Sequence, residues 1–192
     1  MKTTLATLIC SLVLGMSVPA EADTYNVDGV HSMPQFRFKH LNLSYFRGRF
    51  DKVSGTIEFD STRRSGSADI IIAIDSVSTG APLLDEFLKS PKFFDSARFP
   101  AATFRASSFK FSGEQLVSVA GDLSLHGSTR PVVLRVTSFS CHEHALLKVE
   151  ACGADADVTI RRSDFGLDAF IGNDGDDVEL DIAVEAVKAQ RP

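Results

Sequence analysis

The chain has 192 residues, enough for one domain with a sizeable hydrophobic core, and its formal net charge is −5. A mildly acidic chain without basic clusters is a poor partner for nucleic acid, so we expect no binding to DNA or RNA. Enzymes, ligand-binding proteins and protein-interaction modules remain as function classes.

Residues 1–22 have the parts of a secretory signal peptide. Lys2 precedes an apolar run over residues 5–18, and small residues up to Ala22 form an Ala-x-Ala cleavage pattern. The run is shorter than the roughly 20 residues that a membrane-spanning helix needs. We therefore expect an exported protein whose mature domain covers residues 23–192, with no stable membrane anchor after cleavage.

Two cysteines remain after this cleavage, and an even pair in an exported protein predicts a disulfide between Cys141 and Cys152. A metal site is the alternative interpretation, because Cys141 is followed directly by His142, Glu143 and His144. Structural zinc sites usually show two separated ligand pairs, whereas this segment offers one pair only. The sequence therefore favours the disulfide and predicts no bound metal.

Alternating polarity predicts β-strands with one face in water. The pattern is clearest near the C-terminus, and it recurs in three earlier segments. The apolar faces are Val178, Leu180, Ile182, Val184 and Ala186; Ala156, Val158 and Ile160; Val117, Val119, Gly121, Leu123 and Leu125; and Ile57 and Phe59. Further strands are predicted at 36–40, 68–75, 102–111 and 132–140. The nearly continuous apolar run 132–136 is either covered on both sides or bulged.

Many short strands at regular spacing predict an all-β sandwich or barrel, and the pattern alone does not separate the two. One segment, 82–90, breaks the alternation with apolar residues at three- and four-residue spacing, which predicts a short amphipathic helix. The residues with this spacing are Leu83, Leu84, Phe87 and Leu88. We expect the helix and the following Phe93 and Phe94 to form a lid or plug over one end of the sheet; completing the core is the alternative.

The chain contains no recognisable catalytic motif. It has no His-Glu-x-x-His, no Gly-x-Ser-x-Gly, no phosphate-binding glycine loop and no dinucleotide fingerprint. A triad of His31, Ser32 and a remote aspartate can be drawn on paper, but no motif supports it. We expect a protein that is not an enzyme and that needs no cofactor.

The aromatic composition favours an apolar interior, with 15 Phe, 2 Tyr and no Trp. Phe supplies large apolar surface without a polar group. A barrel of about eight strands is just wide enough to be filled by side chains or to hold one slender ligand. A lumen lined by Phe suits a hydrocarbon, and a solid core remains the other possibility.

Five ordered motifs together resemble the YceI family of exported proteins over essentially the whole mature chain. The first is D-G-V-H-S-M-P-Q-F-R-F-K-H from Asp28 to His40, and the second is Gly48, Phe50 and Gly55. The third is L-D-E-F-L-K-S-P-K-F-F-D from Leu84 to Asp95, followed by Pro100 and Phe104. The fourth is Gly121, Leu123, Gly127, Thr129 and Pro131, and the fifth is Arg161, Asp164, Phe165 and Gly166. Leu84 stands where the family pattern has arginine.

This resemblance implies an extended, lipocalin-like antiparallel β-barrel of about eight strands with one short amphipathic helix. It implies a periplasmic binding or carrier protein that holds a polyisoprenoid or similar long-chain amphiphile in its lumen. With the Phe content and the apolar helix, it nominates as ligand contacts Phe36, Phe38, Leu84, Phe87, Leu88, Phe93, Phe94 and Phe104. The polar candidates for the mouth are His31, His40, Arg161 and Asp164, each of which also has a purely structural interpretation.

Two other functions remain open at this point. The protein can be a periplasmic interaction module with a filled core, which uses its outer face and would show a large exposed apolar patch. It can also be a metal protein or enzyme centred on His142, Glu143 and His144. The sequence also leaves open whether the protein forms a homodimer.

Overall fold

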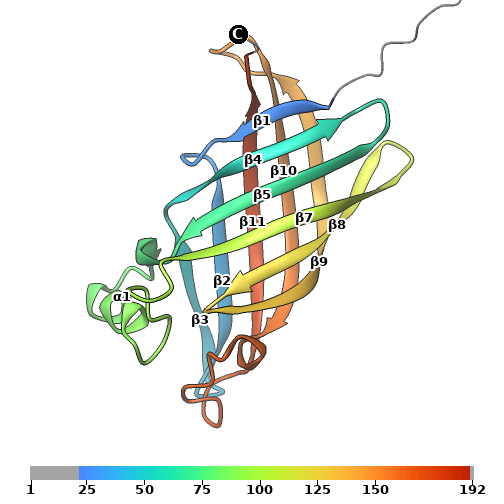
Figure 1. The fold of residues 1–192 in the computed structure, drawn as a ribbon. Coiled ribbons are helices and arrows are strands. Elements are labelled where there is room, and N and C mark those ends of the chain that lie inside the picture. Colours follow the sequence, from blue (N-terminus) through green and yellow to red (C-terminus); the bar gives the residue numbers. More distant parts are fainter. Residues whose placement is uncertain (1–21, 191–192) are drawn as a thin grey trace, which may run out of the picture.

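The computed structural model describes residues 22–190, and the predicted signal peptide lies outside this range except for its last residue. Eight strands form a closed antiparallel barrel (Figure 1). In spatial order they are β1 (Asp23–Val27), β4 (Val53–Asp60), β5 (Ser65–Ala73), β7 (Ala101–Ser112), β8 (Gln115–Leu125), β9 (Ser128–Glu143), β10 (Glu150–Arg161) and β11 (Asp177–Lys188). The pairing of β11 with β1 closes the barrel. The all-β prediction is confirmed, and this closure decides for a barrel over a sandwich.

Three further strands extend the sheet from β11: β2 (Met33–His40), β3 (Ser44–Phe50) and the short β6 (Val77–Ser78). In the β2–β3 pair, Phe36 lies opposite Gly48. A Cβ atom at Gly48 would come within 2.3 Å of the Phe36 ring. Glycine is therefore needed here, because it lets the buried Phe36 ring lie across the neighbouring strand.

The edge of β11 is shared between two strands. Its residues Val178–Ala183 pair with β2, whereas Ala186–Lys188 pair with β1. Between the two ladders, the Ser32 hydroxyl donates to the Glu185 carbonyl at 3.2 Å and accepts the Glu185 N–H at 3.0 Å. Ser32 is only 3% exposed. It thus satisfies buried backbone groups where the β1–β2 connection leaves the sheet.

The predicted alternation holds along most strands. The interior is lined by the five apolar residues predicted for β11, the three predicted for β10, and Ile57 and Phe59 of β4. Two details were wrong. Val117 does not continue the inner face of β8, because a bulge at this point brings Leu116 inside instead. The segment 132–136 is covered on one side only, since Val133 is 60% exposed; the bulge in β9 falls just after it, at Thr137.

The predicted helix is confirmed as α1 (Pro82–Lys89). It lies toward the end of the barrel opposite the β9–β10 turn (Figure 1). Asp85 fixes its first turn by accepting hydrogen bonds from the Thr79 N–H at 2.8 Å and the Thr79 hydroxyl at 2.6 Å. Leu88 is buried in the core cluster that also contains Phe36 and Phe94. Two 3-10 helices complete the fold: η1 (Ile74–Ser76) and η2 (Arg162–Phe165).

The other end of the barrel is closed by an aromatic plug. Tyr25 and Phe59 are buried there, and the Phe59 ring packs at 5.6 Å from Phe139 and 6.1 Å from Phe111. The Tyr25 hydroxyl donates to Glu150, and burial together with this carboxylate raises the Tyr25 pKa above its usual range.

The predicted disulfide is confirmed next to this plug. Cys141 of β9 and Cys152 of β10 lie directly opposite each other and are bonded. Both pack against the same apolar cluster as Phe59. The bridge therefore joins two neighbouring barrel strands at the end where the aromatic plug fills the interior.

Replacing both cysteines by alanine should lower the free energy of unfolding by about 3 kcal/mol, as expected for a bridge that closes a loop of this length. Urea unfolding of the mature protein measures the change. Dithiothreitol should destabilise the wild-type protein and leave the double variant unchanged. Equal unfolding midpoints for the oxidised protein and the double variant would contradict a stabilising role.

Candidate ligand-binding cavity

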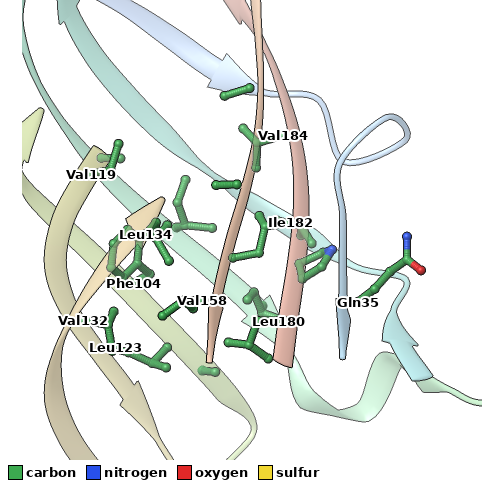
Figure 2. A pocket seen from close by; sticks show the side chains of 18 of the residues that line it. Gln35, Phe104, Val119, Leu123, Val132, Leu134, Val158, Leu180, Ile182 and Val184 are labelled. Carbon is green, nitrogen blue, oxygen red and sulfur yellow. The ribbon is translucent and has the colours of Figure 1, made fainter. Parts of the chain in front are cut away.

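The barrel encloses one long apolar cavity of about 230 Å³. Its walls come from all eight barrel strands and from β2 and β3, and Phe93, Phe94 and Leu167 are among the residues that line it outside the strands. Figure 2 shows Val132, Val158, Leu180 and Ile182 gathering in this space from β9, β10 and β11. One water needs only about 10–15 Å³, but it also needs polar partners, so an apolar space of this size suits a hydrocarbon better than water.

Very few hydrogen-bonding side chains line the cavity: Tyr25, Gln35 and Arg162. The Tyr25 hydroxyl is engaged by Glu150 at the plugged end. The Gln35 side chain is exposed and points away from the other lining residues (Figure 2). Arg162 is therefore the one charged side chain among the described residues of the wall.

Five of the predicted contact residues line the cavity: Phe36, Phe38, Phe93, Phe94 and Phe104. Phe94 packs edge-on against Phe93 at 5.2 Å and against Phe36 at 6.5 Å. These rings join the segment after α1 to β2. The aromatic residues at this end thus form part of the cavity wall.

The three predicted contacts from α1 lie elsewhere. Leu88 is only 3% exposed and sits in the core, with Leu84 packed against the same cluster. Phe87 is partly exposed, and its ring lies 6.3 Å from Phe93 and 6.2 Å from Phe170. The helix covers the end of the barrel without lining the cavity, and contact of these residues with a ligand stays a prediction.

Two of the four predicted polar contacts are histidines bound to nearby aspartates. His31 lies in the β1–β2 connection, where its Nδ1 is 2.8 Å from Asp28, and this carboxylate raises the His31 pKa. His40 lies at the other end of β2, about 25 Å away by strand length, with its Nδ1 3.1 Å from Asp174. Both histidines are exposed and neither lines the cavity.

The other two predicted polar contacts also face outward. Arg161 is paired with Asp176 at 3.1 Å and its side chain is 64% exposed. Asp164 is exposed on η2. The structure brings His40, Arg161 and Asp164 to the same end of the sheet but leaves His31 apart, and ligand contact of all four stays a prediction.

Arg162 is the residue that the sequence reasoning missed. It is 3% exposed, and its guanidinium is held by main-chain carbonyls: Nε donates to Gly175 at 3.0 Å, and Nη1 donates to Leu167 at 2.6 Å and Ala169 at 2.8 Å. Alternation could have found it. Ala156, Val158 and Ile160 lie on the inner face of β10. The next position in this alternation, two residues after Ile160, is Arg162.

The alternative metal site is not assembled in the structure. Cys141 is bonded to Cys152, and the His144 Nδ1 accepts hydrogen bonds from the N–H groups of Leu146 and Leu147. Within residues 22–190, no three side chains of His, Cys, Asp or Glu come together as a metal site would require. In the same range, no helix combines the length and apolar character needed to cross a bilayer.

The model of the YceI-like domain family matches residues 25–186. Curated relatives include Protein YceI of Salmonella newport (strain SL254) and of Salmonella arizonae. Each is 34% identical over 188 residues, which cover 96% of this chain and 95% of the relative. The match therefore includes nearly the full length of both proteins.

Solved structures share the barrel. Burkholderia cenocepacia BcnA superposes with a TM-score of 0.72 at 22% identity, covering 83% of this chain and 98% of BcnA. The Campylobacter jejuni YCEI protein superposes with a TM-score of 0.70 at 27% identity, covering 79% of this chain and 90% of that protein. A polyisoprenoid binding domain from Saccharophagus degradans, implicated in plant cell wall breakdown, superposes with a TM-score of 0.67 at 20% identity. The match covers 88% of this chain and 100% of that domain.

The contrast between the two adjacent arginines is testable. Arg162→Gln should lower the free energy of unfolding by about 3 kcal/mol or more, because three buried or partly buried main-chain carbonyls lose a charged donor. Arg161→Gln removes only an exposed ion pair and should change it by less than about 1 kcal/mol. Urea unfolding of both variants measures the difference, and equal losses would show that the buried position of Arg162 is not what stabilises this end.

Proposed function

The chain belongs to the family of YceI-like domains, and we propose that it is a periplasmic carrier that holds a polyisoprenoid or similar long-chain amphiphile in its barrel. The observation that carries this proposal is the elongated apolar cavity, whose wall spans the barrel from Phe139 and Cys152 to Phe93 and Leu167. Its side chains leave the lumen open, which argues against the interaction module with a filled core.

Burial of the ligand's chain dominates the expected affinity. Removing one five-carbon isoprene unit from water contributes roughly 3 to 4 kcal/mol gross. A typical hydrogen bond contributes only about 1 kcal/mol net. A wall of Phe, Val, Leu and Ile therefore selects for length and apolar character first, and a polar group can only orient the molecule.

Resemblance and export signals support the rest of the proposal. The Saccharophagus degradans domain, which shares the fold, is a polyisoprenoid binding domain. The signal-like residues 1–22 support export to the periplasm. A carrier needs no catalytic group, which agrees with a cavity wall almost free of acids, bases and nucleophiles.

The direct experiment is to purify the protein from its own host and to identify extracted lipid by mass spectrometry. We expect about one molecule of a long-chain amphiphile, with isoprenoid chains the first candidates, per barrel. Recovery of no lipid from protein that also fails to bind added geranylgeraniol would refute the proposal.

A pair of neighbouring valines provides a matched test of where binding occurs. Val132 lines the cavity, whereas Val133 of the same strand is 60% exposed on the outer face. Val132→Phe should weaken geranylgeraniol binding at least tenfold, because the added ring occupies space that several ligand carbons would use.

Val133→Phe should leave the affinity unchanged, because its ring points into solvent. Calorimetric titration measures both variants, and circular dichroism shows that each is folded. Equal affinities of the two variants would place the ligand outside the lumen.

A further inference from the structure

Large apolar side chains are exposed on three segments at the end of the barrel opposite the β9–β10 turn. The segments are the β2–β3 turn, the loop before β11, and α1, and Figure 1 shows them gathered toward the same end. The exposed residues, which we call the apolar rim, are Leu41, Leu43, Leu83, Phe87 and Phe170. Exposed apolar side chains that gather in one region mark an interaction surface, whereas scattered single ones need no explanation.

The fold holds the three segments of the apolar rim together. Asp174 of the loop accepts a hydrogen bond from the Leu41 N–H of the turn at 2.9 Å. In the same loop, the Phe170 ring lies 6.2 Å from the Phe87 ring of α1. The rim is therefore one connected surface.

The geometry of the β2–β3 turn does not require leucine. Leu41 and Asn42 both have a positive φ, 50° and 54°, which favours glycine or asparagine over leucine. Leu43 is 80% exposed, and neither leucine belongs to one of the core clusters of the described chain. Both side chains leave apolar surface in water without stabilising the core. An apolar contact outside the protein accounts for both.

The outer face of the β2–β3 hairpin, next to the rim, is basic. Alternation places on this face the side chains of Gln35, Arg37, Lys39, Tyr45, Arg47 and Arg49. Four of them are cations and none is an acid. Arg37 pairs with Glu179 of β11, and Arg49 pairs with Asp51. The face keeps an excess of positive charge, although the chain as a whole is acidic.

Three cations beside the rim form no ion pair with any carboxylate of the described chain: Lys39, Arg47 and Lys92. Each lies against an aromatic ring instead. The centre of the Tyr45 ring is 4.6 Å from Nζ of Lys39 and 5.9 Å from Cζ of Arg47. The centre of the Phe170 ring is 5.2 Å from Nζ of Lys92.

Exposed acids at this end lie on other segments. Asp164 is on η2, Asp168 is on the loop before β11, and Asp177 begins β11. The positive side of the surface is therefore the β2–β3 hairpin. Exposed Leu and Phe beside Lys, Arg and Tyr match the two parts of a membrane interface, an apolar phase and a layer of charged head groups.

We propose that the apolar rim is a reversible docking surface for an anionic lipid bilayer. The leucine and phenylalanine side chains enter the boundary between head groups and acyl chains, and Tyr45 lies at the level of the head groups. Lys39, Arg47 and Lys92 contact the anionic head groups. An acidic protein would satisfy these cations, but a bilayer offers the apolar side chains a partner at the same time.

The docking surface adjoins one end of the cavity. Phe87 of the rim lies 6.3 Å from Phe93, and Phe93 lines the cavity wall. The aromatic plug around Phe59 is at the other end. Docking thus brings the end without the plug to the bilayer. The proposal concerns the outside of the barrel and does not depend on which molecule the lumen holds.

Sedimentation with lipid vesicles tests the docking. The mature protein is mixed with phosphatidylcholine vesicles that contain either about 30% phosphatidylglycerol or none. We expect at least about tenfold stronger binding to the anionic vesicles. High salt should remove this difference, because it screens exposed charges. Absence of binding to the anionic vesicles, or equal binding to both kinds, would overturn the proposal.

Two strongly exposed leucines provide a matched pair for the apolar contact. Leu43 belongs to the rim, whereas Leu146 is 86% exposed in the β9–β10 turn at the other end. Leu43→Ser should weaken binding to the anionic vesicles about tenfold, because one leucine no longer leaves water. Leu146→Ser should leave the binding unchanged. Equal effects of the two substitutions would contradict docking through the rim.

Two double variants test the charges at equal net charge. Lys39→Gln with Arg47→Gln should reduce the preference for anionic vesicles at least about tenfold. Arg105→Gln with Lys110→Gln, which removes two exposed cations of β7, should preserve it. Equal losses would show a general attraction to the chain and contradict the assigned surface.

Geranylgeraniol binding in the same variants separates this proposal from the proposed function. None of the substituted residues lines the cavity, so all four variants should bind geranylgeraniol as the wild-type protein does. Loss of vesicle binding together with geranylgeraniol binding in the Leu43 variant would indicate a general structural defect and contradict a specific docking role.

Discussion

The shared edge of β11 is the constraint on which the fold and its cavity depend. This strand pairs with β10 along its length, with β2 over its first half and with β1 over its last residues. Because β1 also pairs with β4, the three residues that β11 gives to β1 close the barrel. At the change of partner, the Ser32 hydroxyl and the Asp28 N–H satisfy the backbone of Glu185.

Closure of this sheet turns a simple alternation into an apolar cavity. The side chains on the inner faces of β10 and β11 are apolar and point into one enclosed space, whose wall has very few polar groups to hold water. The two ends then differ in kind. One holds aromatic rings and the disulfide, and the other holds the buried guanidinium of Arg162.

The sequence predicts those features that depend on local pattern. Alternation identifies β10 and β11, and the spacing of Leu84 and Leu88 identifies α1. The pattern misses β1, β3 and the two-residue β6, which are short and mix polar with apolar residues, and it misplaces Val117 because a bulge reverses the alternation there. Among the predicted contacts, the Phe residues outside α1 line the cavity because the surrounding strands enclose them.

Arg162 shows why the polar part of the cavity wall is harder to predict. Family resemblance pointed to Arg161, one position away, and a shift of one residue at a strand end exchanges the inside of a barrel for the outside. Strand periodicity alone places Arg162 on the inner face. Its buried hydrogen bonding follows only from the carbonyls of Leu167, Ala169 and Gly175, which the loop before β11 brings to it in the folded chain.

A crystal structure of protein purified from its own host, without delipidation, tests the central claim of an occupied apolar lumen most directly. Continuous elongated density from Arg162 toward Phe139 is predicted, and a lumen closed by collapsed side chains or filled with ordered water would contradict it.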